Sequence, residues 1–434
     1  MASASVNPLG QSSLAKRLGW TFLLLCCYRI GVHVPIPGVD AAALAAYFKS
    51  LSGTLFDMFD MFSGGGLSNV SVFALGVMPY ISASIIMQLL QVVSPDIKRM
   101  AKEEGQAGRR KITQYTRYLT VLITLVQGLF ISIGLESMTS PDGTPIVLNA
   151  GWHFRMVTMA TFTAGSMLVM WLGEQINEYG IGNGISLIIF AGIIARLPSA
   201  IQEIWVKLQE GSMSVVTLVV FVVFCIVVIV GIIEVQQGQR RIPVQYAKRV
   251  VGRKMYGGQA THIPLKVNQA GVIPVIFAMS FLQFPLTITY FMNSESGAAA
   301  WIEKWLSPTG TPGVWVYAAF NVVLIIFFTY FYTSVTFNPV EVAQNMKANG
   351  GFIPGIRPGK ATVEYLNRVM TRITFVGAVF LAAVAILPTI VSQLGGLNFH
   401  FGGTSLLIAV GVALDTMKQL ENQMVMRNYQ GFLK

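Results

Sequence analysis

The residues that could do chemistry in this chain are few, and their spacing fits no common catalytic or metal-binding pattern. The four histidines, His33, His153, His262 and His400, are scattered, and neither H-E-x-x-H nor G-x-S-x-G occurs. The three cysteines lie in apolar runs without metal-ligand spacing. The sequence therefore predicts no enzyme, no metal site and no cofactor.

The stretch from Gly355 to Ala361 comes nearest to a nucleotide-binding loop. The position five before Gly359 is Pro354, however, and Lys360 is followed by Ala361 instead of Ser or Thr. Because the first glycine and the Mg²⁺-binding hydroxyl are both missing, we expect no nucleotide chemistry here. Any work that the chain does must take its energy from a partner.

Basic residues in two long connections, at about 236–268 and 337–368, are the side chains best suited to bind a partner. They are Arg240, Arg241, Lys248, Arg249, Arg253, Lys254, Arg357 and Lys360. Arginine suits phosphate and carboxylate groups, so that RNA and an acidic protein both fit. Ordinary topology signals would explain the charge, but much shorter connections would serve that purpose, and long loops that mix charged and apolar residues are more often binding surfaces.

The elements that must position these residues are membrane-spanning helices. Of the 434 residues, 53% are hydrophobic and only 11% are charged, whereas soluble domains carry about 25% charged residues. Runs long enough to cross about 30 Å of hydrocarbon lie at about 18–34, 72–93, 117–136, 154–173, 184–201, 213–235, 269–292, 314–336, 369–392 and 403–420. The sequence therefore predicts an all-α polytopic membrane protein with ten transmembrane helices.

Charge in the connections predicts the orientation of these spans. With a cytoplasmic N-terminus, 24 of the 30 Lys and Arg residues fall in cytoplasmic segments and 4 in outer segments, as the positive-inside rule requires. The other two, Arg29 and Arg196, fall near the outer ends of spans, where we expect their side chains to reach the membrane surface. Both termini are therefore expected in the cytoplasm.

An internal repeat is expected, because two sets of five spans must have opposite topologies. Gly76-Val77-Met78-Pro79 in the second span recurs 195 positions later as Gly271-Val272-Ile273-Pro274 in the seventh. Proline loosens a helix, which predicts two interrupted spans, either at a functional centre or as kinked packing helices. We expect the halves at residues 1–202 and 203–434.

An apolar segment at about 55–67, on the predicted outer side, is too short to span the membrane. It contains Leu55, Phe56, Met58, Phe59, Met61, Phe62, Gly64, Gly65 and Gly66. Asp57 and Asp60 are three residues apart and share a helical face. The pattern is typical of an interfacial amphipathic helix, and it also fits a small helix in a cavity with the glycines as a hinge.

Long stretches of the chain resemble the SecY family, the central subunit of the protein-conducting channel. They are Pro35-Ile36-Pro37-Gly38, the stretch from Phe73 to Gln88, Gly108-Arg109-Arg110-Lys111-Ile112, and Trp171 to Ile176 leading into Gly182 to Ser186. They occur in the family's order, and the resemblance covers nearly the whole chain. It implies two clamshell halves around an hourglass pore. Polypeptides would cross through this pore or leave sideways into lipid, driven by a motor ATPase or the ribosome.

The resemblance also implies roles for individual residues. The segment at 55–67 corresponds to the plug, and a pore ring is implied at Val77, Ile81, Ile185, Ile189, Ile276 and Ile408. A lateral gate is implied that includes Ser82, Gln88, Asn268 and Phe284. The basic connections would dock the SecA motor and the ribosome with its rRNA, with Arg357 as the most specific residue.

The partners that the resemblance implies are SecE, which clamps the halves, SecG, signal peptides, nascent secretory or membrane proteins, and lipids of the bacterial plasma (inner) membrane. The residues alone leave two other classes open, a secondary transporter and an intramembrane enzyme. A transporter should carry a polar or charged site at mid-depth, and an enzyme should carry a catalytic motif. The sequence shows neither feature, so both classes are disfavoured.

Overall fold

The computed structural model describes residues 14–40, 43–44, 47, 60, 63–102, 104–138, 143–211, 214–246, 249–251, 254–256, 261–291, 301, 304–305, 313–395 and 403–432. Its main helices are α1 (Leu14–Gly31), α4 (Met78–Val93), α5 (Pro95–Lys102), α6 (Gly105–Ser137), α7 (Trp152–Tyr179), α8 (Gly184–Ala195), α9 (Leu197–Gln209), α10 (Val215–Gln237), α11 (Ile273–Phe291), α13 (Gly313–Thr336), α14 (Pro339–Ala348), α15 (Lys360–Gly395) and α16 (Gly403–Phe432). Its strands are β1 (Gln239–Tyr246), β2 (Arg249–Val251), β3 (Lys254–Tyr256), β4 (Thr261–Lys266) and β5 (Gly351–Phe352).

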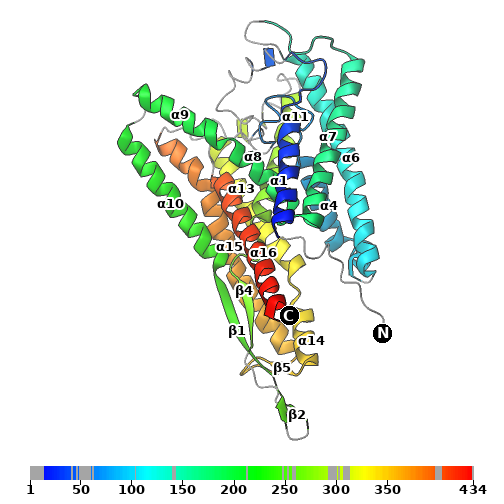
Figure 1. The fold of residues 1–434 in the computed structure, drawn as a ribbon, viewed down its shortest axis with the longest axis vertical. Coiled ribbons are helices and arrows are strands. Elements are labelled where there is room, and N and C mark those ends of the chain that lie inside the picture. The colour runs from blue at the N-terminus through cyan, green and yellow to red at the C-terminus, as the bar shows by residue number, and fades with distance from the viewer. Residues whose placement is uncertain are drawn as a thin grey trace.

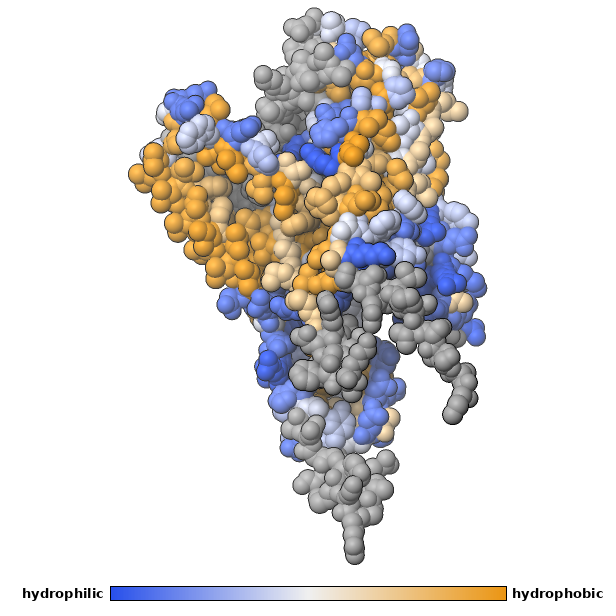
Figure 2. All heavy atoms as spheres, in the orientation of Figure 1, coloured by the Kyte–Doolittle hydropathy of each residue, from blue (hydrophilic) through white to orange (hydrophobic). Residues whose placement is uncertain are grey.

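Each of the ten predicted spans overlaps one of the helices α1, α4, α6, α7, α8, α10, α11, α13, α15 and α16, and the fifth span extends from the 12-residue α8 into α9. Among the described residues, six helices are long and apolar enough to cross a membrane alone, and the pair α4 and α5, bent by 105°, makes a seventh. Figure 2 shows an apolar belt that covers α10 and its neighbours, with hydrophilic residues gathered where β1 and α14 lie. The predicted helical membrane fold is confirmed.

The helices pack as two groups, which Figure 1 shows side by side. In the first group, α6 packs against α4 and α7, and α7 packs against α1 and α8. In the second, α13 packs against α11 and α15, and α16 packs against α10 and α15. The larger contacts between the groups join α4 and α6 to α11, and α8 to α16. The boundary expected at 202/203 lies inside α9.

The two spans expected to be interrupted instead begin late, after a non-helical turn. Helices α4 and α11 start one residue ahead of Pro79 and Pro274, at equivalent positions of the predicted repeat. Proline is favoured in the first turn of a helix because its missing N–H would have no partner there. The preceding glycines, Gly76 and Gly271, have φ angles of +52° and +64°, which glycine adopts without strain. Proline therefore starts these helices instead of kinking them.

The two basic connections contain regular structure that the sequence did not predict. β1 pairs antiparallel with β4 along its length and with β5 at its far end, and β2 pairs with β3. β1 buries Ile242 and Val244 in a small core that includes Met346 of α14 and Leu366 of α15. Charged residues and Pro243 mask this alternation in the sequence.

The described ends of the chain lie on the same side of the molecule as these strands. Figure 1 shows the start of α1 and the end of α16 toward β1, β4 and α14, with the α9–α10 junction at the opposite end. The arrangement fits an even number of crossings between the two ends.

Candidate functional site

The six predicted ring residues lie in one apolar cluster where the two helix groups meet. Val77 precedes α4, and the others lie in α4 (Ile81), α8 (Ile185, Ile189), α11 (Ile276) and α16 (Ile408). Five are 0–6% exposed, and the half-buried Ile185 packs against the same cluster. The structure thus brings together residues from both halves that lie up to 331 positions apart, from residue 77 to residue 408.

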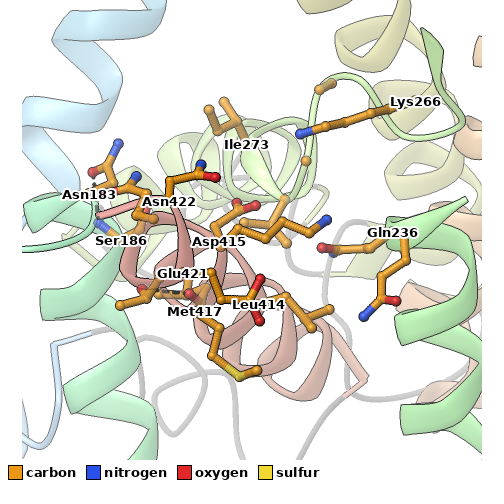
Figure 3. A pocket seen from close by; sticks show the side chains of 18 of the residues that line it. Asn183, Ser186, Gln236, Lys266, Ile273, Leu414, Asp415, Met417, Glu421 and Asn422 are labelled. Atoms are coloured by element: carbon orange, nitrogen blue, oxygen red, sulfur yellow. Dashed lines mark hydrogen bonds between the residues drawn. The ribbon is translucent and has the colours of Figure 1, made fainter. Parts of the chain in front are cut away.

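A cavity of about 770 Å³ lies between α8, α10, α11 and α16 (Figure 3). Its polar lining includes Asn183, Ser186, Gln236, Lys266, Asp415, Gln419 and Glu421. Val272 and Val412 also line it, and each is four residues, about one helical turn, from the ring residues Ile276 and Ile408. The cavity therefore ends about one helical turn from Ile276 and Ile408, and it lies on the side of β1 and β4, which contribute Gln239 and Lys266 to its lining.

The cavity joins the two halves of the chain. Its lining comes from α8 in the first half and from α10, α11 and α16 in the second. The backbone N–H of Gly182 donates to the Oε1 atom of Gln419 across the two halves, at 3.0 Å. Asn183 caps α8 by accepting from the Ser186 N–H at 3.2 Å. The entrance is thus lined by hydrogen-bonding groups before the path turns apolar.

Residues 60 and 63–71, called the glycine-rich segment below, lie on the other side of the ring. Along α8 the order is Ser186 at the cavity, Ile189 in the ring, and then Gly192. A Cβ atom on Gly64 would stand 3.0 Å from the Cα atom of Gly192, so the two backbones are in close contact. Of the predicted plug residues, Gly64, Gly65 and Gly66 fall in this segment, while Leu55, Phe56, Met58, Phe59, Met61 and Phe62 lie outside the described residues.

Polar side chains from α1 and from the end of α8 hold the glycine-rich segment. Arg196 forms an ion pair with Asp60, and Arg29 donates to the carbonyl of Gly64. The Tyr28 hydroxyl donates to the Ser63 carbonyl at 3.1 Å. The expectation that Arg29 and Arg196 reach the membrane surface is therefore wrong, because the segment offers them a carboxylate and a carbonyl. The sequence places Asp60, Arg29 and Arg196 on the same predicted outer side, and this was the one signal that could have indicated their contact.

The predicted gate residues lie on or next to the contact between α4 and α11. Ser82 and Gln88 are half-buried in α4, and Phe284 lies in α11 with its side chain outside the described set. Asn268 is buried in the turn before α11 and donates to the Gly271 carbonyl at 2.9 Å. The side-chain oxygens of Gln88 and Asn268 are buried without a hydrogen-bond partner among the described residues. An unpaired buried acceptor costs about 1–3 kcal/mol, so each of these two oxygens can accept a further hydrogen bond.

A contact that the sequence did not reveal crosses the same interface. The Ser280 hydroxyl in α11 lies 3.7 Å from the sulfur of Met78, the first residue of α4, and it also donates to the Ile276 carbonyl at 2.9 Å. No pattern in the sequence distinguishes this serine from the many others in apolar runs. It shows that the first residue of α4 meets α11 about one helical turn beyond Ile276.

The predicted docking residues that the structure describes are exposed on the strand side of the molecule. Arg240 and Arg241 are exposed in β1. Arg357 is exposed in the turn between β5 and α15, and its carbonyl accepts from the Thr362 hydroxyl at 3.0 Å. Lys360 is the exposed first residue of α15. Arg357 therefore projects from a backbone that local hydrogen bonds fix.

The remaining basic residues of this surface are only partly described. Arg249 and Lys254 lie in β2 and β3, with their side chains outside the described set, and Lys248 and Arg253 lie outside the described residues. In the described part of the chain, no three His, Cys, Asp or Glu side chains gather as metal ligands. The arrangement places a cavity with a largely polar lining, an apolar cluster and the glycine-rich segment in succession along α8.

Comparison with known families identifies relatives over most of the chain. A family model described as SecY matches residues 71–417. The protein translocase subunit SecY of Aquifex aeolicus is 46% identical over 421 residues, which cover 97% of each chain. The protein of the same name from Escherichia coli K12 is 46% identical over 428 residues, covering 98% of this chain and 95% of its own.

Solved structures show the same fold. One, described as the structure of a protein-conducting channel, aligns with a TM-score of 0.65 at 20% identity and covers 95% of this chain and 93% of its own. Another, canine Sec61 in a ribosome–channel complex from the endoplasmic reticulum, aligns with a TM-score of 0.62 at 19% identity, with the same coverage. A third is described by a plug domain that stabilises the closed state, with a TM-score of 0.64 at 20% identity.

Proposed function

The chain belongs to the SecY family of protein translocase subunits, and from that premise we propose that polypeptides cross the membrane through the cavity, the ring and the space now filled by the glycine-rich segment. As a member of this family it is a multi-span channel subunit and not an enzyme. The observation that carries the proposed path is the order along α8, where cavity, ring and segment follow one another within two helical turns. This order supplies an entrance, a constriction and a cover on one axis.

The ring and the segment together form the resting seal in this proposal. A narrow passage lined by Val and Ile excludes ions because water leaves an apolar constriction. The segment at 55–67, acting as the plug, covers the ring from the side away from the cavity. Both parts must give way when a chain enters, which the ring does by side-chain movement and the segment by displacement.

Lateral release of membrane segments is proposed at the contact between α4 and α11. This contact joins the two halves on one side of the ring, and α8 with α16 joins them on the other. The gate residues Ser82, Gln88, Asn268 and Phe284 belong to it. Separation at α4 and α11, with α8 and α16 kept together, opens the path sideways to lipid.

The strand side is proposed as the cytoplasmic docking surface, in the inner membrane of a bacterium. The exposed Arg240, Arg241 and Arg357 suit the carboxylates of a SecA-type motor or the phosphates of ribosomal RNA. SecE and SecG are the proposed partners within the membrane, and signal peptides and nascent chains are the substrates. A solved relative of this fold is described in a ribosome–channel complex, which supports the ribosome as a partner.

Cross-linking to a stalled secretory chain tests the proposed path. A photoreactive residue placed within the stalled chain should form adducts at Ile81, Ile276 and Ile408, and not at Val219, which is 56% exposed on α10 and serves as a matched apolar control. Equal labelling of Val219 and the ring, or labelling of Val219 alone, would mean that the chain does not pass through the ring.

Reporter fusions test the proposed orientation. A reporter after Arg357 should read cytoplasmic, and one near Lys304 should read external, because 24 of the 30 basic residues then lie in cytoplasmic segments. A cytoplasmic signal near Lys304 would contradict the ten-span topology.

A further inference from the structure

We propose that Asp60 and Arg196 form a latch that positions the glycine-rich segment beneath the ring, and that the channel opens by giving up this ion pair. The proposal rests on the sealing role given to the segment above. The contact between the Asp60 carboxylate and the Arg196 guanidinium holds the segment in place, and Tyr28 and Arg29 of α1 assist it.

Asp60 is the centre of the segment's hydrogen bonding. Its side chain is 3% exposed and pairs with Arg196. Its Oδ1 atom also accepts from the backbone N–H groups of Leu67 and Ser68, at 2.9 and 2.8 Å, and from the Ser63 hydroxyl at 3.2 Å. One carboxylate thus closes the segment into a turn and ties that turn to the end of α8.

Helix α1 holds the same segment from the other side. Tyr28 is fully buried, and its hydroxyl donates to the Ser63 carbonyl, while Arg29 donates to the Gly64 carbonyl. Gly64 lies between the Tyr28 hydroxyl and Gly192 of α8. The segment is therefore clamped between α1 and α8 by side chains that reach into it, and its end is paired through the backbone with the stretch after α1, where Ser71 forms a bridge with Pro35.

The backbone of the glycine-rich segment is strained at one residue. Val70, at its end, has a φ of +40°, which a β-branched residue rarely adopts because its side chain is strained there. Its N–H donates to the Leu67 carbonyl and its own carbonyl accepts from the Ile36 N–H, at 2.9 and 3.0 Å. Displacement of the whole segment would free Val70 from this conformation, so that the strain opposes the contacts that hold the segment in place.

The charges predict which change releases the segment most. A buried carboxylate without its partner is strongly unfavourable, so removing Arg196 drives Asp60, and the segment with it, toward water. The substitution Asp60→Asn keeps a side-chain oxygen that accepts from the Leu67 and Ser68 N–H groups, and it removes the charge. Arg196, whose side chain is 26% exposed, tolerates the loss of Asp60 better than Asp60 tolerates the loss of Arg196.

Resting ion conductance of the reconstituted translocon in planar bilayers, normalised to inserted protein, tests the latch. Arg196→Met should raise conductance about tenfold, Asp60→Asn about threefold, and Arg196→Lys little, because it keeps the charge. The decisive variant combines Asp60→Asn with Arg196→Met. It should conduct less than Arg196→Met alone, because no unpaired carboxylate remains buried.

The matched control is Glu136→Gln. Glu136 pairs with Arg155 between α6 and α7, with Oε2 2.6 Å from Nη2, and it does not touch the segment. It should leave conductance unchanged. Equal conductance for Arg196→Met and the combined variant, or an equal rise for Glu136→Gln, would overturn the latch.

Deletion of residues 57–67 separates the latch from the seal. If the deletion raises conductance but the Arg196 variants do not, the segment seals without this latch. If neither the deletion nor the Arg196 variants raise conductance, the segment does not seal the channel, and the latch proposal is wrong as well.

Discussion

The turns that precede α4 and α11 are built alike, yet they lead to different structures. Each has a glycine with positive φ, at Gly76 and Gly271, and each is followed by a helix with proline in its first turn. The ring residues Ile81 and Ile276 occupy the same place in the two helices. The Ile81 N–H donates to the Val77 carbonyl at 3.0 Å, and the Ile276 N–H donates to the Val272 carbonyl at 3.3 Å. The repeat therefore places Ile81 and Ile276 at equivalent positions by means of the same kind of turn.

The segments before the two turns differ in how they are held. The first turn follows the glycine-rich segment, which is held to α1 and α8 by side-chain contacts and, at its end only, by one backbone bridge between Ser71 and Pro35. The second follows β4, which is held by a ladder to β1 and by the Val267 N–H to the Gly238 carbonyl at 2.9 Å. A few side-chain contacts can be given up one at a time, whereas a ladder moves as a unit. The first arrangement suits a releasable seal, and the second suits transmission from a docked partner to the ring.

The largest effect is expected from wetting the ring that both turns create. Ile81, Ile189, Ile276 and Ile408 changed together to Thr should raise resting conductance by several hundredfold, because four hydroxyls that each favour water by about 1 kcal/mol contribute about 4 kcal/mol together, and 1.4 kcal/mol is tenfold. Single-channel recording in planar bilayers measures this.

The control for the ring variant changes four exposed residues of α10, Val216, Val219, Val220 and Val223, to Thr. It adds the same hydroxyls away from the ring and should conduct at the wild-type level. A ring variant that conducts no more than this control would remove the six residues from the seal.

A smaller effect is expected at the proposed docking surface, in the turn between β5 and α15. Arg357→Glu should reduce motor-driven export about fivefold, because a reversed charge on a fixed turn opposes an acidic partner. Export of a secretory protein into vesicles measures this, with insertion of the channel checked by its level in the membrane. Lys360→Glu should have less effect, since an exposed ammonium on a flexible stem contributes little. Equal losses would place the docking contact elsewhere than Arg357.

The smallest effect tests whether the two turns are equivalent. Gly76→Ala and Gly271→Ala each force a positive φ on a residue with a Cβ atom, at a cost of about 1 kcal/mol. Space is not the limit at Gly271, where the nearest atom to an added Cβ, Asp415 Oδ2, is 3.9 Å away. Thermal unfolding in detergent should show similar shifts for both. A shift for only one variant would mean that the turns are not built on the same strain-free glycine.

Much of the fold could be predicted from the sequence because the spans are signalled by hydrophobic length alone. The repeat at Gly76 and Gly271 was also visible, but its meaning was not. Pro79 and Pro274 indicate a helix start only when the preceding glycine is known to be left-handed, and φ cannot be read from residue type. β1 was missed because its buried residues, Ile242 and Val244, are too few to outweigh the charges around them.

The candidate site was less accessible to sequence reasoning. Val and Ile occur throughout such helices, so the ring residues were marked by family resemblance and not by any pattern of their own. Arg29 and Arg196 were assigned to the membrane surface because a span shows where a residue lies along its axis but not what faces it. The pairing of Arg196 with Asp60, 136 positions away, depends on how α8 packs beside α1.

The late start of α4 has a consequence for the thickness of the surrounding bilayer. Its 16 residues measure about 24 Å, less than the roughly 30 Å of hydrocarbon that a span must cross. Its strongly exposed residues, Ile86, Val92 and Val93, lie in its second half, while its first turns are buried in protein. Lipid beside α4 must therefore thin to match the helix, at a cost that grows with acyl-chain length. We expect lateral release to become easier as the reconstituted bilayer becomes thinner, and release that is independent of chain length would show that the lipid does not meet α4 at its exposed face.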